Sequence, residues 1–135
     1  MLEFRDVSFC YCGSDEGVKN INLKIEEGQC VLFAGRSGCG KTTLIRLING
    51  LVPAYFDGNL EGDILLDGES IIGKPICEIS RKVGSVFQNP RTQFFNIDTD
   101  SEIAFGLENF CIGILSRKRT ENFKNQAVIL SLLLL

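Results

Sequence analysis

The feature that most restricts the folds open to this chain is a nine-residue word, Gly35-Arg36-Ser37-Gly38-Cys39-Gly40-Lys41-Thr42-Thr43. It fits the pattern G-x-x-x-x-G-K-T. Residues 30–34, just ahead of it, are all apolar, which predicts a short strand buried on both faces. Behind it, Leu44, Leu47 and Ile48 recur at helical spacing until Gly50. The sequence therefore predicts a strand, a glycine-rich loop and a helix in direct succession.

Such a loop is suited to binding phosphate groups. Its glycines let successive backbone N–H groups point at phosphate oxygens, and the helix N-terminus adds a partial positive charge. In this pattern Lys41 reaches the β- and γ-phosphates, and the Thr42 hydroxyl is a ligand of Mg²⁺. All nine residues are candidate nucleotide-binding residues, and Lys41 is also a candidate catalytic residue. The alternative is a glycine-rich turn that only caps a helix.

Composition adds few constraints. With 135 residues, 44% hydrophobic residues and a net charge of −3, the chain resembles one ordinary globular domain. The acidic balance, and a basic cluster of only three residues at 117–119, argue against nucleic acid as a partner.

Six cysteines raise the question of a metal site or disulfides. The chain contains no histidine and no C-x-x-C pattern, and only Cys10 and Cys12 lie close together. Two ligands do not make a zinc site. We therefore expect free thiols.

Antiparallel hairpins are predicted on both sides of the loop. Residues 2–11 alternate between apolar and polar except for a slip at Arg5 and Asp6, which predicts a bulged strand. Residues 21–25 alternate as a half-buried strand. Asp67 and Gly68, between residues 60–66 and 69–72, are a strong hairpin signal.

The remaining segments add α/β elements. Residues 74–82 can form a short helix, and residues 83–87 a second buried strand that ends at Gln88. Thr99 and Glu102 predict a capping box at the start of another helix. The apolar run 127–135 is too short to span a membrane and predicts a core segment.

This ordered mixture resembles the nucleotide-binding domain of ABC-type ATPases. The segments that carry the match are VSFCYCG with VKNINLKIEEGQ, GRSGCGKTTLIRLINGL, GDILLDGESI, VGSVFQNP and QFFNIDTDSEIAFGLEN. The last of these looks most like the ATPase subunits of energy-coupling factor transporters, which import vitamins and metal ions. The resemblance covers residues 1 to about 110, and the subgroup rests mainly on residues 86–109.

The resemblance implies an α/β fold, a P-loop NTPase core with an antiparallel β subdomain. Residues 1–29 would form the first hairpin, residues 30–110 the core with a hairpin at 60–72, and residues 111–135 an atypical end. The family's LSGGQ-type signature, its strand ending in Asp-Glu and its switch histidine do not occur in this sequence. We therefore expect an incomplete, N-terminal part of such a domain.

The resemblance also assigns residues outside the loop. Tyr11 stands where the family places an aromatic side chain that stacks on adenine; the alternative is that it closes the hairpin core. Gln88 stands where the family has a glutamine that touches Mg²⁺ and the attacking water, so it is a candidate catalytic residue and metal ligand. The alternative is a turn glutamine in solvent. Gln93, Phe94 and Phe95 would lie near the groove for a coupling helix, or pack in the core.

The function implied is that of an energy-coupling factor or ABC-type importer subunit, with ATP and Mg²⁺ as cofactors. Its expected partners are a second ABC ATPase subunit in a dimer and a transmembrane coupling subunit, at the cytoplasmic face of the cell membrane. Two alternatives stay open. One is a catalytically inactive nucleotide-binding fragment or regulator, and the other is another P-loop enzyme such as a kinase.

Overall fold

The structure is a computed structural model that describes residues 1–14, 16–86, 89–99, 101–102, 105, 109 and 128–131. The chain divides into two compact units, residues 1–79 and residues 80–134.

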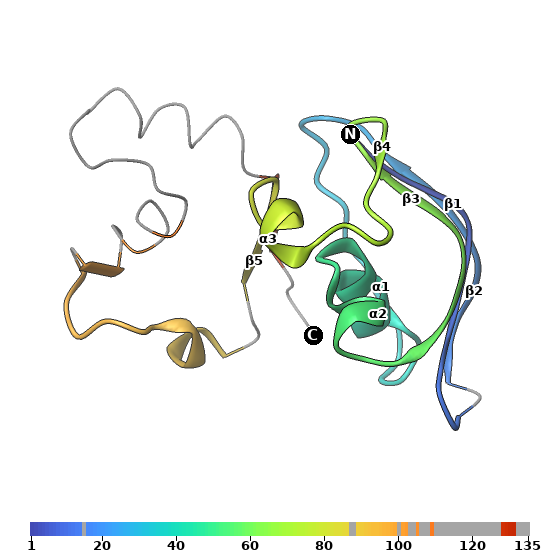
Figure 1. Ribbon diagram of the computed structural model, residues 1–135, viewed down its shortest axis with the longest axis horizontal. Coiled ribbons are helices and arrows are strands. Elements are labelled where there is room, and N and C mark those ends of the chain that lie inside the picture. The colour runs from blue at the N-terminus through green and yellow to red at the C-terminus, as the bar shows by residue number, and fades with distance from the viewer. Residues whose placement is uncertain are drawn as a thin grey trace. The chain divides into compact units, whose positions relative to one another are not determined.

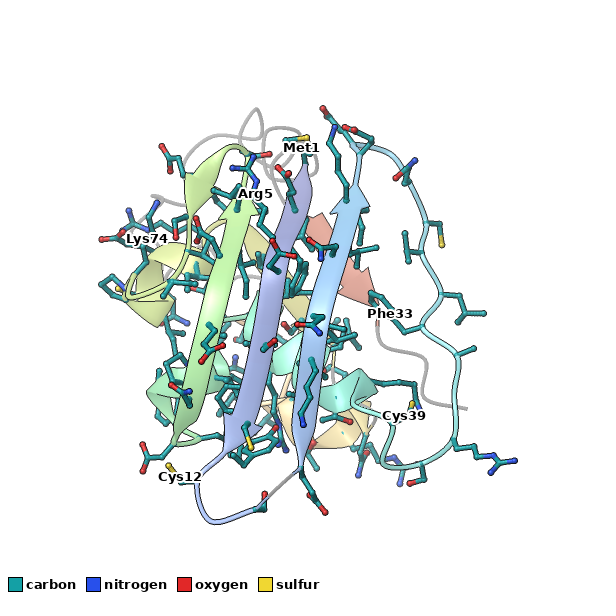
Figure 2. The ribbon with its side chains drawn as sticks, turned by 90° about the vertical axis from the view of Figure 1, so that its right-hand side faces the viewer. Met1, Arg5, Cys12, Phe33, Cys39 and Lys74 are labelled. Carbon is teal, nitrogen blue, oxygen red and sulfur yellow. The ribbon has the colours of Figure 1, made fainter. Side chains whose placement is uncertain are left out.

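The first unit is built on a four-stranded antiparallel sheet. Its order is β2-β1-β3-β4, as Figures 1 and 2 show. The strands are β1 (Leu2–Tyr11), β2 (Gly17–Ile25), β3 (Gly58–Leu66) and β4 (Glu69–Ser70). The central strand β1 is hydrogen-bonded to β2 on one side and to β3 on the other. The predicted hairpins are therefore confirmed, and they share one sheet.

The predicted bulge of β1 is confirmed at Arg5 and Asp6. Pairing with β2 shifts between Phe4 and Val7, and Asp6 has a positive φ of 48°. The Asp6 backbone N–H donates to Asn22 Oδ1 at 2.9 Å, and Asn22 Nδ2 donates to Asp6 Oδ1 at 2.7 Å. Because the bulge inserts an extra residue, the apolar side chains on both sides of it face the core.

The hairpin between β3 and β4 turns at Asp67 and Gly68. Their φ angles are 54° and 83°, the pair of positive values that a type I′ turn needs. The N-terminal ammonium donates to Asp67 Oδ1 at 2.7 Å, and the Asp67 N–H donates to the Met1 carbonyl at 2.8 Å. The turn thus also fixes the start of the chain.

Helices cover one face of this sheet (Figure 1). They are α1 (Lys41–Ile48), α2 (Leu51–Ala54) and α3 (Ile76–Ile79). Most side chains of the core come from β1, β3 and the helices, and Val18 of β2 and Ile71 are buried with them. The largest of them with almost no exposed surface are Phe4, Phe9, Leu47, Ile48, Ile64, Leu66 and Val7. Burying each of these contributes roughly 1.5–3 kcal/mol, which makes this core the main support of α1.

The strand predicted at residues 30–34 is absent, and this prediction was wrong. The segment has no regular secondary structure, and neither sheet of the described residues includes it. Val31 is 42% and Leu32 70% exposed. An apolar strand of this kind is buried only when hydrogen-bonded strands flank it and helices cover it. Within the part of the chain that the structure describes, no strand is hydrogen-bonded to this segment.

The second unit contains β5 (Val83–Val86), the 3₁₀ helix η1 (Pro90–Gln93) and β6 (Val128–Ser131). β5 is the predicted strand, and it pairs in parallel with β6, which lies in the apolar C-terminal run. No helix among the described residues has the length and apolarity needed to cross a bilayer.

The capping box predicted at Thr99 and Glu102 is also wrong. Asp98 Oδ1 accepts the Ser101 backbone N–H at 2.8 Å, so Asp98 caps this helix start. Glu102 Oε2 instead accepts the backbone N–H groups of Phe95 and Asn96, at 3.1 and 2.9 Å. Asp is as good an N-cap as Thr, and here the side chain that accepts the backbone N–H is the acidic one directly before Thr99.

Gly62 gives a direct test of the β1 bulge. It has a φ of 85°, and an added Cβ would lie 2.5 Å from the carbonyl oxygens of Arg5 and Asp6. Gly28 has a similar φ of 78° with open space around it. Both Gly→Ala substitutions carry the backbone cost of a positive φ, about 1–2 kcal/mol. We expect Gly62→Ala to lower the free energy of unfolding by at least about 1 kcal/mol more, because of the clash.

Urea denaturation of the two variants measures this difference. Equal losses of stability would contradict the close approach of β3 to the bulge.

Candidate phosphate-binding site

The glycine-rich loop leads directly into α1, as predicted. Gly40 precedes the helix with a φ of 94°, and Gly38 has a φ of 82°. These values suit glycine and strain other residues. A Cβ on Gly40 would lie 2.6 Å from Val18 Cγ1, so glycine here also allows the loop to approach β2. The start of α1 is thus held against the sheet.

Lys41 folds back over the loop that precedes it. Its Nζ donates to the carbonyl oxygens of Gly35 and Arg36, at 2.6 and 3.0 Å, and lies 3.7 Å from Cys39 Sγ. The Cys39 N–H donates to the same Arg36 carbonyl at 3.2 Å. The loop therefore wraps around one ammonium group, which is positioned within the turn where the sequence pattern expects phosphate.

The N-terminus of α1 is electropositive and uncapped. Gly40 has no side chain to accept a hydrogen bond, and α1 has no acidic residue in its first turn. The first N–H groups of a helix lack partners within the helix, and the macrodipole adds about half a positive charge there. Together with the Lys41 ammonium, these groups favour an anion at this helix end.

The two threonines that follow Lys41 lie in different surroundings. Thr42 is exposed, whereas Thr43 is only 7% exposed. The Thr43 hydroxyl is hydrogen-bonded to the Tyr11 hydroxyl at 3.1 Å. Of the two, Thr42 is the one open to solvent, in keeping with its predicted role toward Mg²⁺.

Tyr11 lies at the end of β1 and is tied to α1. Besides its bond to Thr43, its hydroxyl accepts a hydrogen bond from Arg46 Nη1 at 3.2 Å. Its ring makes edge-to-face contacts with Phe9 and Phe56, at centroid distances of 4.8 and 6.5 Å. These contacts are what the core-closing interpretation expects. Tyr11 is half-buried, and its stacking on adenine stays a prediction.

The first unit brings together Tyr11 and the nine loop residues. Arg36, Ser37 and Cys39 are exposed, and Figure 2 shows Cys39 on the loop outside the long strands. Sequence reasoning missed Arg46 and Phe56. A signal for Arg46 was present, because it lies three residues after Thr43 and thus on the same face of the helix.

The predicted residues after β5 are placed only in part. Gln88 lies outside the described residues, so its role stays a prediction. Phe94 is 64% and Phe95 74% exposed, so neither packs in the core. The ring of Phe95 stacks on that of Phe105 at a centroid distance of 5.3 Å. Gln93 Nε2 donates to the Ser85 carbonyl at 2.9 Å.

The described residues contain no ready-made metal site. No group of three His, Cys, Asp or Glu side chains among them could hold an ion. The five described cysteines are free thiols. A divalent cation at this loop would therefore depend on Thr42 and on the oxygens of a bound phosphate, the arrangement in which Mg²⁺ usually occurs.

Comparison with known sequences places these features in a family. The model of the ABC transporter family matches residues 18–130. A relative from Treponema denticola, named "Putative ABC transporter ATP-binding protein", is 56% identical over 110 residues, which cover 81% of this chain and 22% of that protein. A second protein of that name from the same organism is 38% identical over 133 residues, 98% of this chain and 27% of its own length.

Archaeal proteins are similar too. A relative of the same name from Methanosarcina mazei is 41% identical over 110 residues, 81% of this chain and 19% of that protein. The chain thus spans between about a fifth and a quarter of the length of these relatives.

The two threonines give a matched test of the site's geometry. We expect Thr43→Val to lower the free energy of unfolding by about 1 kcal/mol, because it removes the hydrogen bond to the Tyr11 hydroxyl. Thr42→Val changes an exposed hydroxyl and should stay within about 0.5 kcal/mol of wild type. Chemical denaturation of both variants measures the difference. A larger loss for Thr42→Val would contradict the placement of these side chains.

Proposed function

Because the chain belongs to the ABC transporter family, we propose that it binds ATP together with Mg²⁺ through the loop at residues 35–43. The observation that carries the proposal is the Lys41 ammonium, hydrogen-bonded to two loop carbonyls at the uncapped N-terminus of α1. A triphosphate is the ligand whose charge suits two adjacent positive features.

Each part of the site has a role in this proposal. The loop N–H groups and Lys41 bind the β- and γ-phosphates, and the exposed Thr42 hydroxyl is available to Mg²⁺. The bound Mg²⁺ would neutralise phosphate charge. Tyr11 lies at the end of β1, linked to α1 through Thr43, and would contact the base. Gln88 would supply a contact to Mg²⁺ and to the attacking water.

For the whole protein we propose an importer of the energy-coupling factor type, which couples ATP hydrolysis to uptake of a vitamin or metal ion. The support is the likeness of residues 86–109 to that subgroup. Its partners would be a second ABC ATPase subunit and a transmembrane coupling subunit at the cytoplasmic face of the membrane. The exposed rings of Phe94 and Phe95 are available for such a contact.

Lys41 is the direct test of the site. We expect Lys41→Ala to weaken ATP binding at least about tenfold, because it removes the cation aimed at the phosphates. Lys19→Ala is the control, since Lys19 is an exposed lysine on β2. Isothermal titration calorimetry with Mg²⁺ measures affinity, and far-UV circular dichroism should show both variants folded. Wild-type affinity in folded Lys41→Ala would refute the site.

Cys39 reports occupancy of the loop without mutation. Its thiol is exposed and lies 3.7 Å from Lys41 Nζ. We expect ATP with Mg²⁺ to slow alkylation of Cys39, because bound phosphates would occupy the space that the reagent needs. Cys77, exposed on α3, should react equally in both conditions. Mass mapping of the labelled cysteines measures both rates; no protection of Cys39 would count against the loop as the phosphate site.

A further inference from the structure

We propose that Arg46 is a positioning residue for the nucleotide base, which holds Tyr11 and Phe56 in fixed places beside the phosphate loop. The inference rests on the proposed function, ATP binding by this loop. Arg46 itself belongs to the last turn of α1 and is not part of the G-x-x-x-x-G-K-T word.

The Arg46 guanidinium contacts two aromatic side chains at once. Its Nη1 donates to the Tyr11 hydroxyl at 3.2 Å, and its Cζ lies 4.0 Å from the centre of the Phe56 ring. A planar guanidinium can donate hydrogen bonds in its plane while its face lies on a ring. Lysine, with a compact ammonium, cannot reproduce both contacts.

The hydroxyl of Tyr11 is held from a second side. Thr43 Oγ1 lies 3.1 Å from it, so the phenol can accept from Arg46 and donate to Thr43. Both partners belong to α1, one turn apart. Tyr11 is therefore fixed to the helix through its polar end, while its ring packs edge-to-face with Phe9 and Phe56.

The charge of Arg46 is directed to this cluster. None of the ion pairs found within the described residues involves Arg46, and its hydrogen-bond partner there is Tyr11. Arg46 is half-buried, so its contacts with Tyr11 and Phe56 are partly shielded from water. Within the described residues, the Arg46 guanidinium therefore interacts with Tyr11 and Phe56 and not with an acidic side chain.

This geometry connects two halves of the proposed nucleotide site. Lys41 and Thr42 begin α1, and Arg46 joins the same helix to the end of β1, where Tyr11 lies. The helix thus sets the spacing between the phosphate loop and the aromatic side chain proposed for the base. Loss of Arg46 should free Tyr11 and weaken contacts to the base, while contacts to phosphate persist.

The test compares ATP with inorganic tripolyphosphate, which has the phosphates but no base. Calorimetry with Mg²⁺ is run on the full chain as wild type, Arg46→Met, Arg46→Lys, Tyr11→Phe and the Arg46→Met/Tyr11→Phe double variant. We expect Arg46→Met and Tyr11→Phe each to weaken ATP binding about fivefold, because a base-stacking contact is partly lost. Tripolyphosphate affinity should be unchanged. The double variant should be no weaker than Arg46→Met, and Arg46→Lys should recover only part of the affinity.

Arg81→Met is the control, since Arg81 is an exposed arginine outside residues 1–79, and it should match wild type for both ligands. A purely structural role of Arg46 would lower both affinities together, and that result would overturn the inference. So would an unchanged ratio of ATP to tripolyphosphate affinity in Arg46→Met. If that variant does not fold, an unchanged ratio in Tyr11→Phe is enough to overturn it. Wild-type protein that binds neither ligand would instead refute the proposed function.

Discussion

The candidate site depends on the packing of α1 against the sheet. Ile45, Leu47 and Ile48 are buried in the core, and Gly40 lets the start of the helix come close to Val18 on β2. A side chain at residue 40 would clash with Val18 and prevent this packing. Because α1 carries Lys41, Thr42, Thr43 and Arg46, its placement sets the positions of all of them at once. The packing of α1 against the sheet therefore determines both the core of the first unit and the geometry of the site.

The positive potential of the site depends on the absence of neutralising groups at the N-terminus of α1. Neither a capping side chain nor an acidic residue neutralises its N-terminus, and the Lys41 ammonium is bound by neutral carbonyl oxygens. The residues that cap a helix best with a side chain are Ser, Thr, Asp and Asn, and none of them is at the N-cap of α1. With Gly40 the helix loses only roughly a few tenths of a kcal/mol of capping energy, and its N-terminus stays available to an anion.

Much of the first unit could be predicted from the sequence because its signals are local. Strand alternation, the slip at Arg5 and Asp6, and the turn at Asp67 and Gly68 each depend on neighbouring residues. The strand expected at residues 30–34 could not be predicted in this way, because a buried parallel strand needs partners far away in the chain. An apolar run predicts a buried strand only where partner strands are present to pair with it.

The same distinction between local signals and long-range contacts applies to the site. The motif predicted Lys41, Thr42 and the glycines, whose roles depend on backbone geometry close by. It did not predict the link between Tyr11 and Arg46, which are 35 residues apart and meet only through the fold. The helix cap was missed for a different reason: Asp98 and Thr99 are adjacent, both are good N-caps, and the sequence alone does not choose between them.

The most direct measurement of the central claim is a calorimetric comparison of ATP and AMP on the wild-type chain in the presence of Mg²⁺. The two ligands share the base, the ribose and one phosphate, so they differ in the β- and γ-phosphates that Lys41 is proposed to bind. Our account predicts one ATP site per chain and AMP binding at least about a hundredfold weaker, because charge-assisted contacts to two phosphates are lost. Equal affinity for the two nucleotides, or no binding of ATP, would contradict it.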